Sequence, residues 1–242
     1  DDQIKLIEKL LKETGLDERV SPRTLLSRID RAKNRGADPA APTGAWDDEI
    51  AQIYPLYQAQ LAKENAVDFN DLLLKTLELF DHPDAGPRLR VRYRQVLVDE
   101  FQDTNKVQYQ LVWRFAEATR NLTVVGDDDQ SIYAWRGADI SNILQFEEQY
   151  GGKAGARVVR LEENFRSVDP ILTTASRLIK HNSQRKHKDL IATRGGGEKI
   201  EVVLCRDEHH EAKLVVDWVR RLKEEGLTRP DGSRKDLEWK DC

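Results

Sequence analysis

Two short segments of the sequence carry side chains suited to phosphate chemistry, and the first is "VLVDEFQD", residues 96–103. A hydrophobic strand that ends in two acids has the form of a Walker B element. In such an element the first acid, here Asp99, holds Mg²⁺ through water, and the second, Glu100, orients or deprotonates an attacking water. Many strands end in acid, however, so this pattern alone predicts a solvated turn about as well.

The second segment is "VVGDDDQSIYAWRGAD", residues 124–139, in which acids and aromatic residues lie close together. Its three consecutive aspartates suit a metal–phosphate site. Tyr133, Trp135 and Arg136 suit a nucleic-acid surface, because aromatic rings stack on any base without reading the sequence. The alternative is that Tyr133 and Trp135 pack in the protein core.

The composition sets limits on what these segments can serve. The chain has 242 residues and a mass of 27.8 kDa, is 34% charged and 39% hydrophobic, and carries a net charge of −4. No apolar run approaches the roughly 18 residues of a membrane span, and no signal peptide begins the chain, so we expect a soluble protein without a membrane partner. The only cysteines are Cys205 and Cys242, which favours a reducing compartment.

The net charge does not favour long-range attraction of the whole chain to DNA, so local basic segments matter more. Residues 177–194 hold six Lys or Arg against one Asp, and residues 23–35 hold five against one. For either segment alone, the simpler interpretation is a solvated helix face. His209, His210 and Glu211 lack the i, i+4 spacing of helical metal ligands, and we predict no metal site there.

The elements that must position these residues follow from periodicity. Apolar residues recur at helical spacing up to about residue 93, with a stop at Gly15, an N-cap and Pro pair at Ser21 and Pro22, and a kink or restart at Pro55. The pattern then becomes strand, helix, strand, which predicts a parallel pair with a crossover helix. Further strands are predicted at residues 156–161 and 199–205, each followed by a helix whose start is marked by an aspartate.

Three of these segments resemble motifs of a known family. Residues 98–105 ("VDEFQDTN"), 124–139 and 161–167 ("LEENFRS") resemble, in order, motifs II, III and IV of the UvrD/Rep/PcrA family of superfamily 1 DNA helicases. The segments "SPRTLLSRIDRAKN" and "AVDFNDLLL" extend the resemblance toward the N-terminus.

The resemblance implies an α/β fold: an incomplete RecA-like (P-loop NTPase) parallel-sheet motor domain, an N-terminal helical subdomain and the start of a second RecA-like domain. It places the helical, 1B-like subdomain at residues 1–66. The second half of motor domain 1A, with motifs II and III, then occupies residues 67–155. Residues 156–242, with motif IV, begin motor domain 2A.

The resemblance also assigns roles around ATP and Mg²⁺. Asp99 positions Mg²⁺, Glu100 is the general base, Gln102 lies at the nucleotide, and Gln130 senses the γ-phosphate. Arg166 reaches the γ-phosphate from the second motor domain, as an arginine finger does.

In motif IV, Phe165 departs from the usual family residue, and Arg166 has a simpler alternative role. Phe165 stands where the family usually has a tyrosine that stacks on adenine, and the substitution keeps the ring. Arg166 has the alternative of a surface salt bridge with Glu162 or Glu163. In motif III the resemblance assigns Tyr133, Trp135 and Arg136 to the DNA, with Trp135 stacking on a base.

The function implied is an ATP-dependent DNA helicase or translocase, by family 3′→5′. It would act in DNA repair or replication on single-stranded DNA and single-strand/double-strand junctions, in the cytoplasm at the nucleoid, with unspecified repair proteins as partners. The 242 residues contain no G-x-x-x-x-G-K-[ST] and no methionine. We therefore expect an internal fragment that alone neither binds ATP tightly nor hydrolyses it.

Two rival functions stay open. The chain could be the motor part of a helicase–nuclease. It could also be a non-catalytic DNA-binding module on a degenerate helicase core, although intact Asp99, Glu100, Gln130 and Arg166 argue against decay.

Overall fold

The structure, a computed structural model, describes residues 2–40, 48–151, 156–186, 188–228 and 234–241. The chain divides into two compact units. The first comprises Asp1–Glu162 and Ser176–Asp189, and the second comprises Glu163–Ala175 and Leu190–Cys242. No helix in the described ranges is long and apolar enough to cross a membrane.

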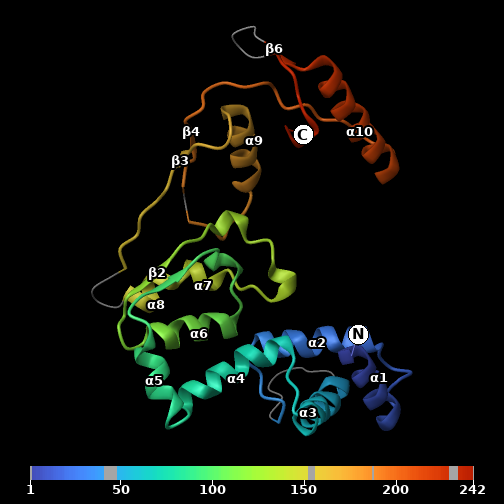
Figure 1. The fold of residues 1–242 in the computed structure, drawn as a ribbon, viewed down its shortest axis with the longest axis vertical. Coiled ribbons are helices and arrows are strands. Elements are labelled where there is room, and N and C mark those ends of the chain that lie inside the picture. Colours follow the sequence, from blue (N-terminus) through green and yellow to red (C-terminus); the bar gives the residue numbers. More distant parts are fainter. Residues whose placement is uncertain (1, 41–47, 152–155, 187, 229–233, 242) are drawn as a thin grey trace. The chain divides into compact units, whose positions relative to one another are not determined.

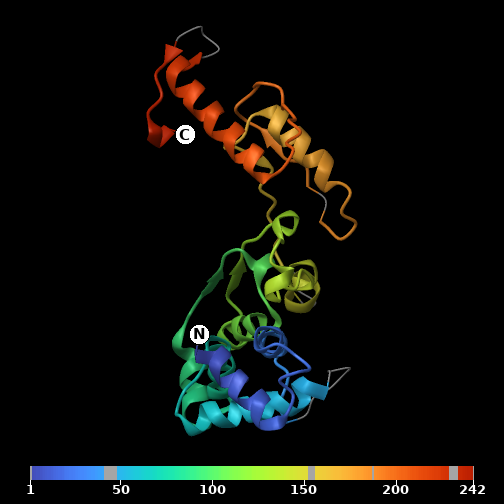
Figure 2. The same cartoon turned by 90° about the vertical axis from the view of Figure 1, so that its right-hand side faces the viewer.

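The first unit begins with three helices that contact one another, α1 (Asp2–Thr14), α2 (Pro22–Asn34) and α3 (Asp48–Lys63) (Figure 2). Two predicted helix signals are confirmed. Gly15 follows α1 with a φ of +69°, and the Ser21 hydroxyl accepts a hydrogen bond from the Thr24 amide with Pro22 in the first turn. Helix α3 continues through Pro55, so the helix does not restart there. The core consists of Ile7, Leu10, Leu11, Leu16, Val20, Leu25, Ile29, Ala32, Ile50, Ile53, Tyr54, Tyr57 and Leu61.

The next helices, α4 (Phe69–Asp81) and α5 (Ala85–Arg92), continue the all-helical region to residue 92, as the periodicity predicts. Asp68 and Asp71 form a capping box at the start of α4. Both carboxylates also bind Lys33 of α2, whose Nζ lies 2.5 Å from Asp68 Oδ2 and 2.8 Å from Asp71 Oδ1. The Lys33 side chain is completely buried, so this ion-paired cluster fixes α2 against the start of α4.

A parallel strand pair follows, as predicted. Strand β1 (Val96–Val98) lies beside β2 (Leu122–Val124), with Val96 opposite Leu122, and α6 (Lys106–Ala116) is the crossover helix between them (Figure 1). Asn105 caps α6 in a capping box with Gln108. Helices α7 (Ser141–Leu144) and α8 (Phe146–Gly151) complete this part of the unit.

The second unit contains a short parallel pair and a short antiparallel pair. Strand β3 (Glu163–Asn164) pairs with β4 (Ile191–Ala192), and β5 (Leu227–Thr228) pairs with β6 (Arg234–Lys235). Helix α9 (Asp169–Ile179) begins in this unit and ends in the first. Helix α10 (Glu208–Glu225) is capped by Asp207, whose carboxylate accepts from the His210 amide, as predicted.

The strand predictions at residues 156–161 and 199–205 are wrong for this structure, in which neither segment forms a strand. Several of their apolar side chains are exposed, including Val159, Leu161 and Leu204. A strand requires a neighbour for its backbone N–H and C=O groups, and no described segment pairs with either run. The expected domain boundary after residue 66 stays a prediction, and residues 152–155, before the other expected boundary, lie outside the described residues.

Candidate functional site

The loops after β1 and β2 meet because the two strands are parallel and adjacent. We call residues 99–105 loop 1 and residues 125–139 loop 2. Val125 N donates to Val98 O at 2.8 Å, and Phe101 N donates to Val125 O at 2.9 Å. The carboxyl ends of parallel strands are where open α/β sheets bind ligands, so the two loops lie at the expected edge.

Asp99 and Glu100 lie at the start of loop 1, and both are exposed. Glu100 has φ +49° and ψ +44°, a left-handed conformation that is uncommon for a residue with a Cβ. Its amide donates to Asp99 Oδ1 at 2.9 Å. Such strain costs on the order of 1–3 kcal/mol and persists where the surroundings hold the residue, which is frequent in active sites.

Gln102 connects the two loops. Its side-chain Nε2 donates to Glu100 Oε2 at 2.8 Å, and its Oε1 accepts from the Asp127 amide at 2.9 Å. The residue is 1% exposed. A Cβ on Gly126 would lie 2.7 Å from this Oε1, so a glycine is needed for the close approach. Gln102 is thus buried and hydrogen-bonded to both loops, and the nucleotide contact that the resemblance implies for it stays a prediction.

Gln130 is held by the same loop. Its backbone N–H donates to Asp127 O at 2.9 Å, and its side-chain Nε2 donates to Asp127 Oδ2 at 2.8 Å. A continuous hydrogen-bonded path therefore runs from Glu100 through Gln102 and Asp127 to Gln130. The structure thus brings together four predicted nucleotide-site residues: Asp99, Glu100, Gln102 and Gln130.

The three consecutive aspartates of loop 2, Asp127, Asp128 and Asp129, bind basic residues of the same unit. Asp129 receives two hydrogen bonds from Arg185, from Nε at 2.8 Å and from Nη2 at 2.7 Å. Lys188 Nζ forms ion pairs with all three carboxylates, among them Asp128 at 3.5 Å and Asp129 at 3.4 Å. The solvated-face interpretation of residues 177–194 is therefore wrong for Arg185 and Lys188, whose side chains are 7% and 16% exposed.

Charge and burial act against each other at these carboxylates. Burial alone would raise the pKa of Asp129, but the hydrogen bonds and charges of Arg185 and Lys188 outweigh it and lower the pKa below its ordinary value. Asp103 in loop 1 differs, because burial and the nearby Glu100 charge raise its pKa. Its Oδ1 is buried without a hydrogen-bond partner in the described part of the chain. The only sequence signal for the aspartate–basic pairing was its opposite charge.

Of the predicted DNA-facing residues, Trp135 and Arg136 are exposed and Tyr133 is half-buried. The Trp135 side chain is 71% exposed, which excludes the core-packing alternative for this residue in the structure. The Arg136 guanidinium lies 4.9 Å from the Tyr133 ring centroid and 4.6 Å from that of Trp135. The two rings and the cation therefore form one platform, which offers both stacking and positive charge.

Motif IV lies in the second unit, where Phe165 is 70% exposed and Arg166 is also exposed. The Asn164 side chain accepts from the amides of Arg166 and Ser167 at 3.1 and 2.8 Å, which fixes the turn after β3. Arg194 donates to Arg166 O at 2.9 Å. Within the described ranges Arg166 forms no ion pair, so the alternative salt bridge with Glu162 or Glu163 is not formed.

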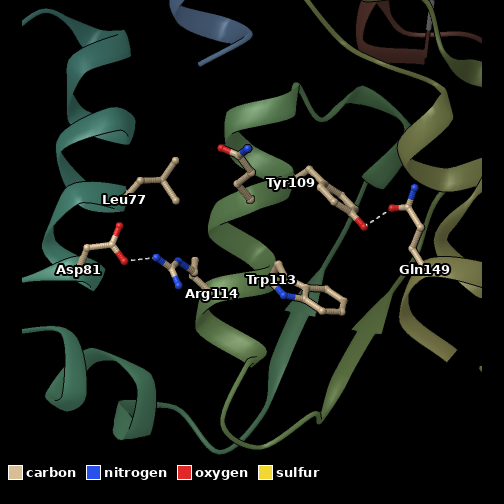
Figure 3. Close-up of a pocket in the computed structure, with 7 residues that line it drawn as sticks. Leu77, Asp81, Tyr109, Trp113, Arg114 and Gln149 are labelled. Atoms are coloured by element: carbon tan, nitrogen blue, oxygen red, sulfur yellow. Dashed lines mark hydrogen bonds and ion pairs between the residues drawn. The ribbon is translucent and has the colours of Figure 1, made fainter. Parts of the chain in front are cut away.

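A separate pocket of about 590 Å³ lies along α6, between α4 and α8 (Figure 3). Arg114 binds Asp81 on one side of it, and the Tyr109 hydroxyl binds Gln149 on the other. It contains none of the predicted site residues. Its lining consists of Leu77, Asp81, Tyr109, Gln110, Trp113, Arg114 and Gln149.

Loop 1 suits Mg²⁺ only in combination with a bound nucleotide. In the described ranges no cluster of three His, Cys, Asp or Glu residues could hold a metal by itself. Mg²⁺ typically keeps several waters and takes one or two carboxylates plus phosphate oxygens. The exposed Asp99, held by the Glu100 amide and free of ion pairs among the described residues, fits that ligand set.

Two family models of helicase domains match the chain. The family model of the UvrD/REP helicase N-terminal domain matches residues 1–151, and that of the UvrD-like helicase C-terminal domain matches residues 159–232. The chain belongs to the UvrD/Rep helicase family. The first match covers both loops, and the second covers motif IV.

Individual UvrD/Rep relatives match over most of the chain. The ATP-dependent DNA helicase PcrA of Bacillus subtilis is 41% identical over 231 residues, which are 93% of this chain and 31% of that protein. PcrA of Leuconostoc citreum is 39% identical over 228 residues, 92% of this chain and 30% of that protein. A probable DNA helicase II homolog of Rickettsia felis is 39% identical over 232 residues, 93% of this chain and 35% of that protein. The chain thus spans about a third of the length of the curated relatives it matches.

Proposed function

We propose that these 242 residues form the central part of an ATP-dependent DNA helicase that moves 3′→5′ along single-stranded DNA. The names of the relatives and the share of their length that the chain matches support this proposal. The observation that carries it is the hydrogen-bonded path from Glu100 to Gln130, which continues along loop 2 to the exposed Trp135 platform. In this proposal Gln130 is the phosphate sensor and Trp135 the base-stacking residue, five residues apart in loop 2.

In this proposal the chain completes a RecA-like motor whose phosphate-cradling P-loop lies outside the 242 residues. Asp99 would hold the Mg²⁺ that accompanies ATP, and the ion would neutralise phosphate charge. Glu100, oriented by Gln102, accepts the proton of the attacking water. The side-chain amide of Gln130 donates a hydrogen bond to the γ-phosphate.

Motif IV supplies the other part of the proposed ATP site, from a second RecA-like motor. Arg166 stabilises the charge of the transferring phosphoryl group, and Phe165 stacks on adenine. Closure of the motors around ATP shifts Gln130, and loop 2 transmits that shift to Tyr133, Trp135 and Arg136. A base-stacking grip that reads no sequence suits a motor that steps along any strand.

The substrates we propose are single-stranded DNA and its junctions with duplex, during repair or replication at the bacterial nucleoid. The relatives are named as DNA helicases of bacteria, which supports this setting. We also propose that proteins of DNA repair are partners of the helicase.

The test is Glu100→Gln in the complete helicase. Glutamine keeps the shape and the hydrogen bond with Gln102 but cannot accept a proton, so nucleotide binding should persist while hydrolysis falls about 10²–10⁴-fold. Fluorescent-nucleotide titration and steady-state ATPase assays measure the two effects. Glu148→Gln, an exposed acid on α8, is the matched control and should hydrolyse ATP at the parental rate.

Two outcomes contradict the proposal in different ways. Hydrolysis by Glu100→Gln at near the parental rate would remove the general-base assignment. DNA binding without any ATPase activity in the unchanged helicase would show instead a non-catalytic DNA-binding module.

A further inference from the structure

The last residue of α2, Asn34, contacts both functional loops from the helical region. Its Oδ1 accepts from Asn105 Nδ2 at 2.9 Å, and its Nδ2 donates to the carbonyl oxygen of Arg136 at 3.3 Å. Asn105 ends loop 1 and Arg136 belongs to loop 2. The Asn34 side chain therefore connects α2 to both loops, although Asn34 lies 71 residues from Asn105 and 102 residues from Arg136 in the sequence.

The contact with loop 1 is made to a residue that is itself rigid. Asn105 is 6% exposed, and its Oδ1 accepts from the Gln108 amide as the N-cap of α6. Its Nδ2 is thereby aimed at Asn34. The acceptor side of Asn34 is consequently fixed to the start of the crossover helix.

The contact with loop 2 lies beside a glycine in the left-handed conformation. Gly137 has φ +90°, which a residue with a Cβ rarely adopts, and a Cβ there would lie 3.1 Å from Asn34 Cβ. The chain of loop 2 thus passes directly over Asn34. The donated hydrogen bond to Arg136 O holds the loop at that point.

Asn34 is a firm support because its neighbour in α2 is anchored. Lys33 is fully buried between Asp68 and Asp71 at the start of α4. On the same helix, Asp30 Oδ1 accepts from Asn70 Nδ2 at 2.8 Å. The end of α2 therefore has little freedom to move with loop 2.

We propose that Asn34 is a positioning residue for DNA binding, which holds the Arg136 backbone so that the Tyr133–Trp135–Arg136 platform is preorganised for a stacked base. This inference rests on the proposed function. In it the helical region takes part in DNA affinity by setting the geometry of loop 2, without touching the strand at Asn34. The Arg136 guanidinium lies over both rings, so a displaced Arg136 backbone disturbs the whole platform.

Hydrogen exchange of the 242-residue chain tests the positioning without DNA. The amides of Gly137 and Ala138 donate to the carbonyls of Ala134 and Tyr133. Asn34→Ala should raise their exchange rates about three- to tenfold, the value of one lost hydrogen bond, while amides inside α6 stay unchanged. Asn34→Asp still accepts from Asn105 but cannot donate to Arg136 O, so it should loosen the same two amides. Arg35→Ala, one residue on, is the matched control and should not.

DNA binding tests the purpose of that positioning. The probe is a fluorescent oligo-dT, titrated into the complete helicase and followed by anisotropy. Asn34→Ala should weaken binding about three- to tenfold. In a Trp135→Ala background the same substitution should have little further effect, because a support for the platform has nothing left to position.

Three results would contradict different parts of this role for Asn34. Unchanged exchange at Gly137 and Ala138, or exchange that rises equally throughout α2 and α6, would overturn the positioning of loop 2. Additive losses of Asn34→Ala and Trp135→Ala would overturn its action through the platform. If Trp135→Ala alone leaves oligo-dT binding unchanged, the proposed DNA surface fails, and the exchange result still decides whether Asn34 positions loop 2.

Discussion

Loops 1 and 2 and the motif IV segment carry equally recognisable sequence motifs, yet they are held in different ways. In the loops, side chains bind side chains: Gln102 binds Glu100, Gln130 binds Asp127, and Arg185 binds Asp129. In motif IV the described hydrogen bonds of Arg166 involve only its backbone, and the side chains of Phe165 and Arg166 are exposed. Glu100 and Gln130 are therefore positioned by side-chain contacts within one folded unit, whereas the Arg166 side chain has no hydrogen-bond or ion-pair partner among the described residues.

The largest effect that would sharpen this comparison is expected at Arg166. Arg166→Ala should reduce ATP hydrolysis by the complete helicase about 10³–10⁵-fold, because an arginine finger acts only on the transition-state charge. The thermal unfolding midpoint should hardly change, since no described partner of its side chain is lost. Arg220→Ala, an exposed arginine on α10, is the control for steady-state ATPase assays. A large loss of stability in Arg166→Ala would show that the side chains of motif IV are held by protein contacts, as those of loops 1 and 2 are.

The next largest effect is expected on the stability of the first unit, at the buried Lys33. Lys33→Ala leaves Asp68 and Asp71 buried without their cation, and such a change typically costs about 3–5 kcal/mol of unfolding free energy. Urea denaturation of the 242-residue chain measures it. Lys12→Ala breaks an exposed pair with Glu8 and should shift the midpoint little. Equal, small shifts for both variants would contradict the anchoring of α2.

A smaller effect is expected from pH. The pKa of Asp129 is lowered in the folded chain, so its ion pairs stabilise the fold above the ordinary value near 3.8 and are lost as pH falls below it. The raised pKa of Asp103 acts in the opposite sense and partly offsets this loss in acid. Asp129→Asn should therefore make urea midpoints fall less steeply between pH 5 and pH 3, a range of roughly one unit on either side of that value. Asp217→Asn, on the exposed side of α10, should follow the unchanged chain, and an unchanged slope in Asp129→Asn would contradict the assignment.

The sequence predicts those parts of the fold that depend on neighbouring residues. Helical periodicity and caps such as Ser21 and Asp207 are local, and the strand–helix–strand unit around α6 follows from the order of its elements. The strands predicted at residues 156–161 and 199–205 are not formed, because pairing depends on a partner that local pattern does not reveal.

The candidate site shows the same limit. Asp99, Glu100 and Gln130 are found from motifs, since their types and order carry the signal. The residues that hold these loops are distant in sequence. Asn34 donates a hydrogen bond to Arg136 across 102 residues, and Arg185 donates to Asp129 across 56 residues. An asparagine at a helix end and a basic segment are common features, so neither residue type predicts such a partner.

In the proposed function loop 2 joins nucleotide sensing to DNA contact, and Trp135→Ala in the complete helicase tests this coupling most directly. Single-strand affinity should fall by about 1–3 kcal/mol, the value of one base–aromatic stack. Stimulation of ATPase activity should also be blunted at saturating DNA, with the unfolding midpoint unchanged because Trp135 is 71% exposed. Trp218→Ala, another exposed tryptophan, is the control. Normal stimulation by DNA in Trp135→Ala would mean that loop 2 does not couple the two sites, and a loss of about 3–5 kcal/mol of stability would contradict the exposed position of Trp135.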